Sequence, residues 1–202
     1  MKTKLLLSVL TCLASTSLFA ADSPAVGKAA PDFSVTDSKG KTQSVSQYKG
    51  KTVVLEWFNP ECPFVKKHYG SNNMQKLQDE FTGKGVVWLT IDSSAAGKEG
   101  NLTAEQAEKK MAEWKMKSSA LLLDPDGKAG QTYGAKNTPH MFIINPEGKL
   151  IYAGAIDSKA SPNPADIPSS TNYVKVALDE SLAGKTVSNP TTRPYGCSVK
   201  YK

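Results

Sequence analysis

Residues 53–69 read VVLEWFNPECPFVKKHY, and this stretch contains the strand-to-helix transition that decides the fold. The apolar run at 52–58 is typical of a strand buried on both faces of a sheet. A polar turn follows, and Cys62 then stands directly before Pro63, a residue that suits the first position of a helix. The apolar residues after Pro63 recur at helical spacing. The sequence therefore predicts a strand, a short turn and a helix that begins at a cysteine.

This position favours a reactive Cys62. The first N–H groups of a helix have no partner within the helix, and the helix dipole places partial positive charge there. A thiolate is stabilised at such a position, so we expect the pKa of Cys62 to lie below its reference of about 8.5. Lys66 and Lys67 are expected to add positive charge, while Glu61 is expected to point to solvent. The alternative is a small, buried and unreactive cysteine.

The rest of the chain alternates strand and helix patterns. This alternation predicts an α/β fold of one domain, a central sheet with helices on both faces. We expect a β-hairpin within residues 31–48, strands at 86–92 and 119–124, a second hairpin from 140–145 and 149–156, a helix at 63–83 that breaks at 70–73, and further helices from 103, at 127–134 and at 173–182.

The N-terminus has the layout of a secretory signal peptide. Lys2 and Lys4 precede a short apolar run, and small residues follow at Ala20 and Ala21. We expect residues 1–21 to be this signal, 22–184 to form the folded domain and 185–202 to form a C-terminal tail. The expected location is therefore periplasmic or secreted. No later stretch is long and apolar enough to cross a bilayer, so we expect no membrane insertion.

Composition excludes some partners and leaves the role of the cysteines open. Of 202 residues, 39% are hydrophobic and 22% charged, as in soluble globular proteins. The net charge of +6 comes from scattered lysines, so nucleic-acid binding has no support. Of the three cysteines, Cys12 belongs to the predicted signal. Cys62 and Cys197 remain, and they form a structural bridge, a redox pair or two free thiols.

Three short motifs resemble those of a known family. They are NPECPFVK at 59–66, Thr138-Pro139 before a strand, and GCSVKYK at 196–202. Together they are similar to the thioredoxin superfamily, and within it to the peroxiredoxin-like redoxin group related to alkyl hydroperoxide reductase and thiol-specific antioxidant. The resemblance covers the chain from about residue 30 onward. It implies a thioredoxin-like fold with an N-terminal β-hairpin, a central mixed sheet flanked by helices, and a C-terminal tail.

The resemblance also implies roles for individual residues. Cys62 matches the nucleophilic first cysteine of a thioredoxin CxxC motif, and Val65 occupies the second position. Cys197 is then the candidate resolving thiol, which attacks a mixed disulfide or sulfenate on Cys62. Glu56 matches a buried acid that relays protons, with a lysine-paired strand carboxylate as the alternative.

The substrate groove is expected around the two cysteines. Thr138-Pro139 matches the cis-proline loop, which offers backbone groups to a substrate chain. The candidate substrate-binding residues are Asn59, Pro63, Thr138 and Pro139. Arg193 and Lys200 flank Cys197 and are expected to lower its pKa.

Two departures from peroxiredoxins bear on the substrate. Asn59 stands where those enzymes place Thr or Ser, and no arginine lies between Cys62 and the tail. We therefore expect an exported thiol-based oxidoreductase that favours thiol–disulfide exchange over peroxide reduction. Its partners would be a protein or small-molecule thiol, disulfide or peroxide and an electron-donor protein of unknown identity. No cofactor and no metal are expected.

Two other functions are compatible with the sequence. One is a non-catalytic binding module of the redoxin fold, with its thiols bridged permanently. The other is a copper-binding chaperone that uses Cys62, Cys197 and His140. The second histidine, His68, is expected to be an ordinary, partly exposed side chain.

Overall fold

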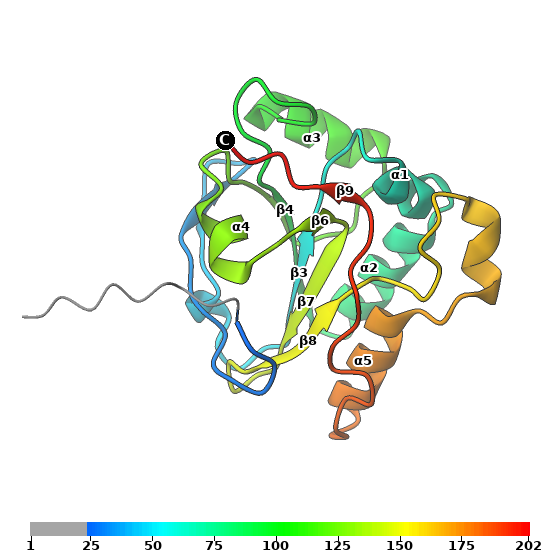
Figure 1. Cartoon of the computed structure of the whole chain (residues 1–202). Coiled ribbons are helices and arrows are strands. Elements are labelled where there is room, and N and C mark those ends of the chain that lie inside the picture. Colours follow the sequence, from blue (N-terminus) through cyan, green and yellow to red (C-terminus); the bar gives the residue numbers. More distant parts are fainter. Residues whose placement is uncertain (1–23) are drawn as a thin grey trace, which may run out of the picture.

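The fold is built on one seven-stranded sheet, seen in a computed structural model that describes residues 24–202. The strand order is β2-β1-β5-β4-β3-β7-β8 (Figure 1). Strands β3, β4 and β5 run parallel to one another, whereas β1, β7 and β8 pair antiparallel with their neighbours. The predicted signal peptide and Cys12 lie outside the described residues.

The strands are β1 (Val35–Asp37), β2 (Thr42–Gln43), β3 (Val53–Trp57), β4 (Val87–Asp92), β5 (Ala120–Leu123), β6 (Asn137–Thr138), β7 (His140–Ile144), β8 (Leu150–Gly154) and β9 (Cys197–Ser198). The helices are α1 (Pro63–Gly70), α2 (Asn73–Gly83), α3 (Ala104–Glu113), α4 (Lys128–Tyr133) and α5 (Tyr173–Leu182), with 3₁₀ turns at Ser46–Tyr48 and Pro164–Ser169. The predicted elements and the predicted α/β class are therefore confirmed.

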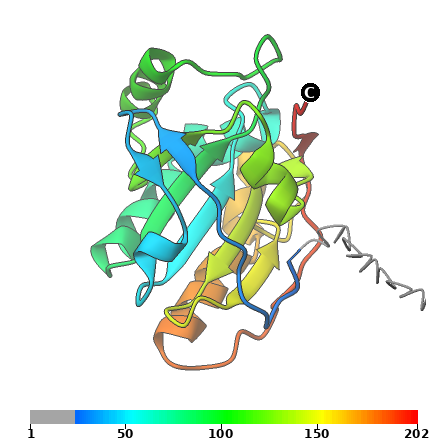
Figure 2. The ribbon, with the colours of Figure 1, turned by 90° about the vertical axis from the view of Figure 1, so that its left-hand side faces the viewer.

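Both faces of the sheet are covered, which explains the unbroken apolar run of β3. Val54 and the following Phe58 join the core beneath α1, α2, α3 and α5. Leu55 and Trp57 point the other way, into the core beneath α4 and the N-terminal hairpin. Figure 2 shows that hairpin and α4 on the face turned to the viewer. All five residues of β3 are buried, as expected for a central strand with two packed faces.

Local sequence signals set the helix ends. Pro63 opens α1, and Asn72 in the left-handed conformation, with φ of 61°, separates α1 from α2. Thr103 caps α3 through a reciprocal pair of hydrogen bonds with Gln106. In residues 24–202, no helix has the length and apolar character needed to cross a membrane.

The tail follows an extended path that the sequence did not predict. It leaves α5 and passes the edge of β8, where Thr192 N–H donates to Ala153 O at 3.2 Å. It then forms β9, which pairs antiparallel with β6 so that Cys197 lies opposite Thr138. In Figure 1 this segment rises from α5 to β6. The tail thus links the two ends of the sheet.

Candidate active site

Cys62 lies at the end of the turn that connects β3 to α1, at the carboxyl ends of the parallel strands. It is the N-cap residue of α1, as predicted, and it is only 2% exposed. Its Sγ–H donates to Thr138 O at 3.0 Å. The Thr138-Pro139 peptide bond is cis, as the resemblance implied. The proline loop, the start of α1 and the Cys62 sulfur therefore meet at one point.

The surroundings of Cys62 favour its thiolate. Burial opposes the charged form, but donors around the sulfur outweigh it and hold the pKa of Cys62 below the ordinary value of 9.0. These donors are the Cys197 thiol, the Thr138 side chain and the amides of Cys197 and Val65. The Thr138 hydroxyl is buried and has no hydrogen-bond partner among the described residues, so it is available to the thiolate.

Cys197 approaches Cys62 from the tail and has the opposite electrostatic character. It is partly exposed and is a free thiol, as is Cys62. Burial, followed by the interaction with Cys62, raises the pKa of Cys197 to about 11. Lys200 lowers that pKa only in part. Arg193 is exposed. The predicted effect of Lys200 is therefore present, but burial and Cys62 outweigh it, and the predicted effect of Arg193 stays a prediction.

The two lysines after Cys62 are already paired. Lys66 forms an exposed ion pair with Glu61 at 2.8 Å, which leaves Glu61 at the surface as predicted. Lys67 is buried and pairs with Asp157 at 3.0 Å. The positive charge that the sequence predicts at each lysine is therefore offset by a carboxylate.

Asn59 holds the neighbouring loop rather than facing the sulfur. Its Nδ2 donates to Glu99 O at 2.9 Å and Ser94 Oγ at 3.3 Å, and its Oδ1 accepts from Glu61 N–H at 2.8 Å. Gly100 packs so closely that a Cβ there would lie 2.2 Å from Asn59 Oδ1. The amide is thus fully engaged within the protein. Pro63 occupies the first turn of α1 beside Cys62.

Glu56 lies fully buried beneath α1 and α2 among neutral donors. Trp88 Nε1 donates to it at 2.8 Å, and Tyr69 OH donates to it at 2.8 Å. Gln78 and Thr90 donate at 3.2 Å each. Burial raises the pKa of Glu56 above 4.5, although these hydrogen bonds favour the carboxylate. No lysine pairs with Glu56 among the described residues, so the alternative of a lysine-paired carboxylate is wrong.

The two histidines are both buried. His68 is 0% exposed, so the expectation of an ordinary surface side chain is wrong. Burial lowers the pKa of His68 and of His140 to about 4. The ring of His140 accepts a hydrogen bond from Lys136 N–H through Nδ1, at 3.3 Å, and stacks on Phe142. In the part of the chain that is described, no three His, Cys, Asp or Glu side chains gather as a candidate metal site.

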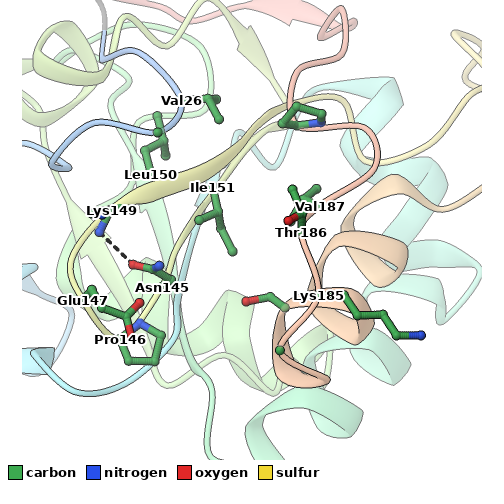
Figure 3. Close-up of a pocket in the computed structure, with 14 residues that line it drawn as sticks. Val26, Asn145, Pro146, Glu147, Lys149, Leu150, Ile151, Lys185, Thr186 and Val187 are labelled. Atoms are coloured by element: carbon green, nitrogen blue, oxygen red, sulfur yellow. Dashed lines mark hydrogen bonds between the residues drawn. The ribbon is translucent and has the colours of Figure 1, made fainter.

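The sequence reasoning missed several residues that seat the tail. Tyr195 donates from its hydroxyl to Asp157, and Gly196 touches the backbone of Thr138. The glycine directly before Cys197 was the available signal, since glycine permits a close backbone approach. A cavity of about 760 Å³ lies elsewhere, between the β7–β8 turn and residues 184–187 (Figure 3). Among residues 24–202, no cysteine or histidine lines this cavity.

Comparison with known proteins identifies the family of this chain. The model of the AhpC/TSA family matches residues 26–153, and the chain belongs to this family. The thiol-disulfide oxidoreductase ResA of Bacillus thuringiensis subsp. konkukian is 29% identical over 126 residues, 62% of this chain and 67% of that protein. ResA of Bacillus subtilis is 28% identical over 151 residues, 72% of this chain and 79% of that protein.

Solved structures support the same fold. An uncharacterized conserved protein from Geobacillus kaustophilus superposes with a TM-score of 0.75 at 26% identity, over 88% of this chain and 93% of its own. The thioredoxin domain of a thiol-disulfide oxidoreductase from Bacteroides vulgatus gives a TM-score of 0.52 at 23% identity, over 73% and 98%. The predicted thioredoxin-like fold, the redoxin group and the class of thiol-based oxidoreductase are thus confirmed.

Proposed function

We propose that this member of the AhpC/TSA family carries out thiol–disulfide exchange on protein disulfides, with Cys62 as the nucleophile and Cys197 as the resolving thiol. The observation that carries this proposal is that two free thiols lie next to each other at the cis-proline loop, one with a lowered pKa and the other with a raised pKa. The pKa of Cys62 is lowered, in part by the neighbouring Cys197. A thiolate is the attacking species in exchange, so Cys62 is the group suited to attack first.

The first step forms a mixed disulfide. The Cys62 thiolate attacks one sulfur of the substrate disulfide, and the other substrate sulfur leaves as a thiolate. In the second step Cys197 loses its proton and attacks Cys62 Sγ, which expels the remaining substrate sulfur. The substrate has then gained two electrons, and the protein holds a Cys62–Cys197 disulfide. A dithiol reductant returns the protein to its starting state by the same chemistry.

The raised pKa of Cys197 orders these steps. While Cys62 is a thiolate, burial and the charge of Cys62 together keep Cys197 protonated. Once Cys62 is bound in a mixed disulfide, that charge is gone and the pKa of Cys197 falls. The second thiol therefore becomes more reactive only after the first has reacted.

The remaining site residues have supporting roles. Thr138 would contribute its backbone and hydroxyl beside the sulfur, with Pro139 and Pro63 shaping the groove. Asn59 would hold the turn before Cys62, because its amide is engaged within the protein. Glu56 would accept or return a proton, and Glu56→Gln is the variant that tests this role. Because Asn59 and Lys66 are engaged elsewhere, peroxide reduction is less favoured than exchange.

Export is part of the proposal. The basic residues, the short apolar run and the small residues of 1–21 fit a signal peptide. Two cysteines that cycle between thiol and disulfide suit an oxidising compartment. Cell fractionation of the full chain, with N-terminal sequencing of the mature protein, tests location and cleavage together.

Trapping the mixed disulfide tests the residue roles. We expect Cys197→Ser to accumulate a mixed disulfide between Cys62 and disulfide-bonded insulin. The reason is that Cys197 can no longer attack Cys62 Sγ and release the substrate. Cys62→Ser should form no adduct and should reduce insulin no faster than dithiothreitol alone. Ser198→Ala, beside Cys197, is the matched control and should behave like the wild type.

The result that contradicts the proposal is an unchanged rate of insulin reduction in Cys62→Ser. A parallel measurement of hydrogen peroxide consumption separates the two chemistries. Peroxide consumption that depends on Cys62, without insulin reduction, would replace exchange with peroxidase activity.

A further inference from the structure

A buried charged cluster beside the active site has no part in the exchange steps. Lys67 Nζ lies 3.0 Å from Asp157 Oδ2 and donates to Lys159 O at 3.0 Å. His68 Nε2 lies 3.8 Å from the same Asp157 oxygen. The side chains of Lys67, His68 and Asp157 are at most 3% exposed. Charged side chains are rarely buried this deeply unless they are paired, so the cluster requires an explanation.

Tyr195 of the tail completes this cluster. Its hydroxyl donates to Asp157 Oδ1 and lies 3.4 Å from His68 Nε2. Its ring meets the ring of Phe64 edge-on at 5.7 Å, and Lys67 Nζ lies 5.6 Å from its centre. Three residues of α1 therefore contact one tyrosine of the tail. Because α1 begins at Cys62, this contact ties the tail to the helix that presents the nucleophile.

The segment after Tyr195 is held just as closely. A Cβ on Gly196 would lie 2.1 Å from Thr138 O and 3.5 Å from Phe64 Cβ. The next residue, Cys197, pairs with Thr138 across β6 and β9. Tyr195 is thus two residues from the resolving thiol, and the glycine between them packs closely against Thr138 O.

With the tail in this position, Cys62 is 2% exposed. An outside disulfide has to reach Cys62 Sγ in line with its own S–S bond, which such burial prevents. The tail therefore does two things at once. It brings Cys197 to Cys62, and it closes the approach to Cys62.

We infer that Tyr195 is a positioning residue for the exchange reaction: bound to Asp157 and α1 it seats Cys197 on Cys62, and its release admits the outside disulfide. The claim that release of Tyr195 admits an outside disulfide rests on the proposed function. The bond from the Tyr195 hydroxyl joins a neutral donor to a carboxylate, a strong class of hydrogen bond. The carboxylate keeps Lys67 as its partner when Tyr195 leaves, so opening does not strand a buried charge.

The variant Tyr195→Phe tests the inference because it removes one hydroxyl and keeps the ring. We expect Cys62 to be alkylated by iodoacetamide about tenfold faster, the factor that corresponds to one hydrogen bond to a charged group. The equilibrium constant for forming the Cys62–Cys197 disulfide in a glutathione buffer should fall by a similar factor. Labelling of each cysteine is followed separately by peptide mass spectrometry.

Tyr48→Phe is the matched control. It also deletes a tyrosine hydroxyl that makes one hydrogen bond, to Gln43 at 2.6 Å in the N-terminal hairpin, and it should change neither measurement. Phe64→Leu gives a second test with the same direction, since it removes the ring contact and leaves the hydroxyl bond. Should Tyr195→Phe label Cys62 at the Tyr48→Phe rate, the inference is overturned.

This experiment separates the inference from the proposed function. Alkylation by iodoacetamide needs no exchange activity, so faster labelling supports the positioning role even if insulin is not reduced. Insulin reduction that depends on Cys62, with unchanged labelling in Tyr195→Phe, supports the function and removes Tyr195 from it.

Discussion

The two ends of the central sheet differ in how they are filled. At the carboxyl ends of β3, β4 and β5 the tail packs onto the cis-proline loop, and Cys62 is buried. At the opposite end, near the β7–β8 turn, a cavity of about 760 Å³ stays open and lacks cysteine and histidine (Figure 3). The difference teaches that the two cysteines of the proposed site lie where the tail fills the end of the sheet, and not at the open cavity.

The largest expected effect that would sharpen this comparison is a pH dependence of the free energy of unfolding, caused by His68 at the filled end. Burial lowers the pKa of His68 from 6.5 to about 4. Between these two pH values, His68 is protonated in the unfolded chain and neutral in the folded protein. The contribution of His68 to stability is present above pH 6.5 and is lost as the pH falls toward 4. The loss amounts to about 3 kcal/mol at the acid end.

Urea unfolding at pH 7 and pH 4.5 checks this prediction. His68→Gln should lose less free energy of unfolding between the two pH values than the wild type. Glu147→Gln, at the open end, is the control and should keep the wild-type difference. An identical pH dependence in His68→Gln and the wild type contradicts the prediction.

An intermediate effect is expected from the same substitution made at each end. Gly196 and Gly184 both have positive φ, 126° and 71°. A Cβ at Gly196 collides with Thr138 O, whereas a Cβ at Gly184 meets nothing within 4 Å. We expect Gly196→Ala to lower the free energy of unfolding by about 1–3 kcal/mol and to expose Cys62 to alkylation. Gly184→Ala should cost about 1 kcal/mol from backbone strain alone.

Chemical denaturation and iodoacetamide labelling measure the two quantities on the same samples. If Gly184→Ala accelerates the labelling of Cys62 as much as Gly196→Ala does, the claim that only the filled end controls access to Cys62 is contradicted.

The smallest expected effect concerns the pKa of Cys62 itself. Replacing Cys197 with Ala removes a thiol donor, while burial continues to oppose the thiolate. The pKa of Cys62 should therefore rise in Cys197→Ala, and its thiolate should disappear at a higher pH than in the wild type. Thiolate absorbance at 240 nm during a pH titration measures this shift. A pKa that stays the same or falls would remove Cys197 from the donors of Cys62.

The sequence was sufficient for the fold and for the first cysteine. The apolar run of β3 and the Cys62-Pro63 step are local signals, and each determines its own element. The cis-proline loop followed from the resemblance, on the strength of Thr138-Pro139. All of these were confirmed because the information lies within a few residues.

The tail and the buried charges were beyond such reasoning. Strand β9 has two residues, and its partner Thr138 lies far away in the chain, so no local pattern reveals it. His68 was expected to be partly exposed, and nothing in the sequence near Lys67 indicated that its side chain is buried, since lysine is almost never fully buried unless it is paired. Their pairing with Asp157 and Tyr195 depends on contacts between α1, the loop after β8 and the tail.

The far end of the tail has a consequence for natural variation. A Cβ on Gly127 or Gly130 would lie 2.7 Å and 2.3 Å, respectively, from the ring or hydroxyl of Tyr201. The two glycines therefore leave the space that the aromatic ring fills. In homologues these three positions should covary: a larger residue at either glycine should be accompanied by a smaller one in place of the tyrosine.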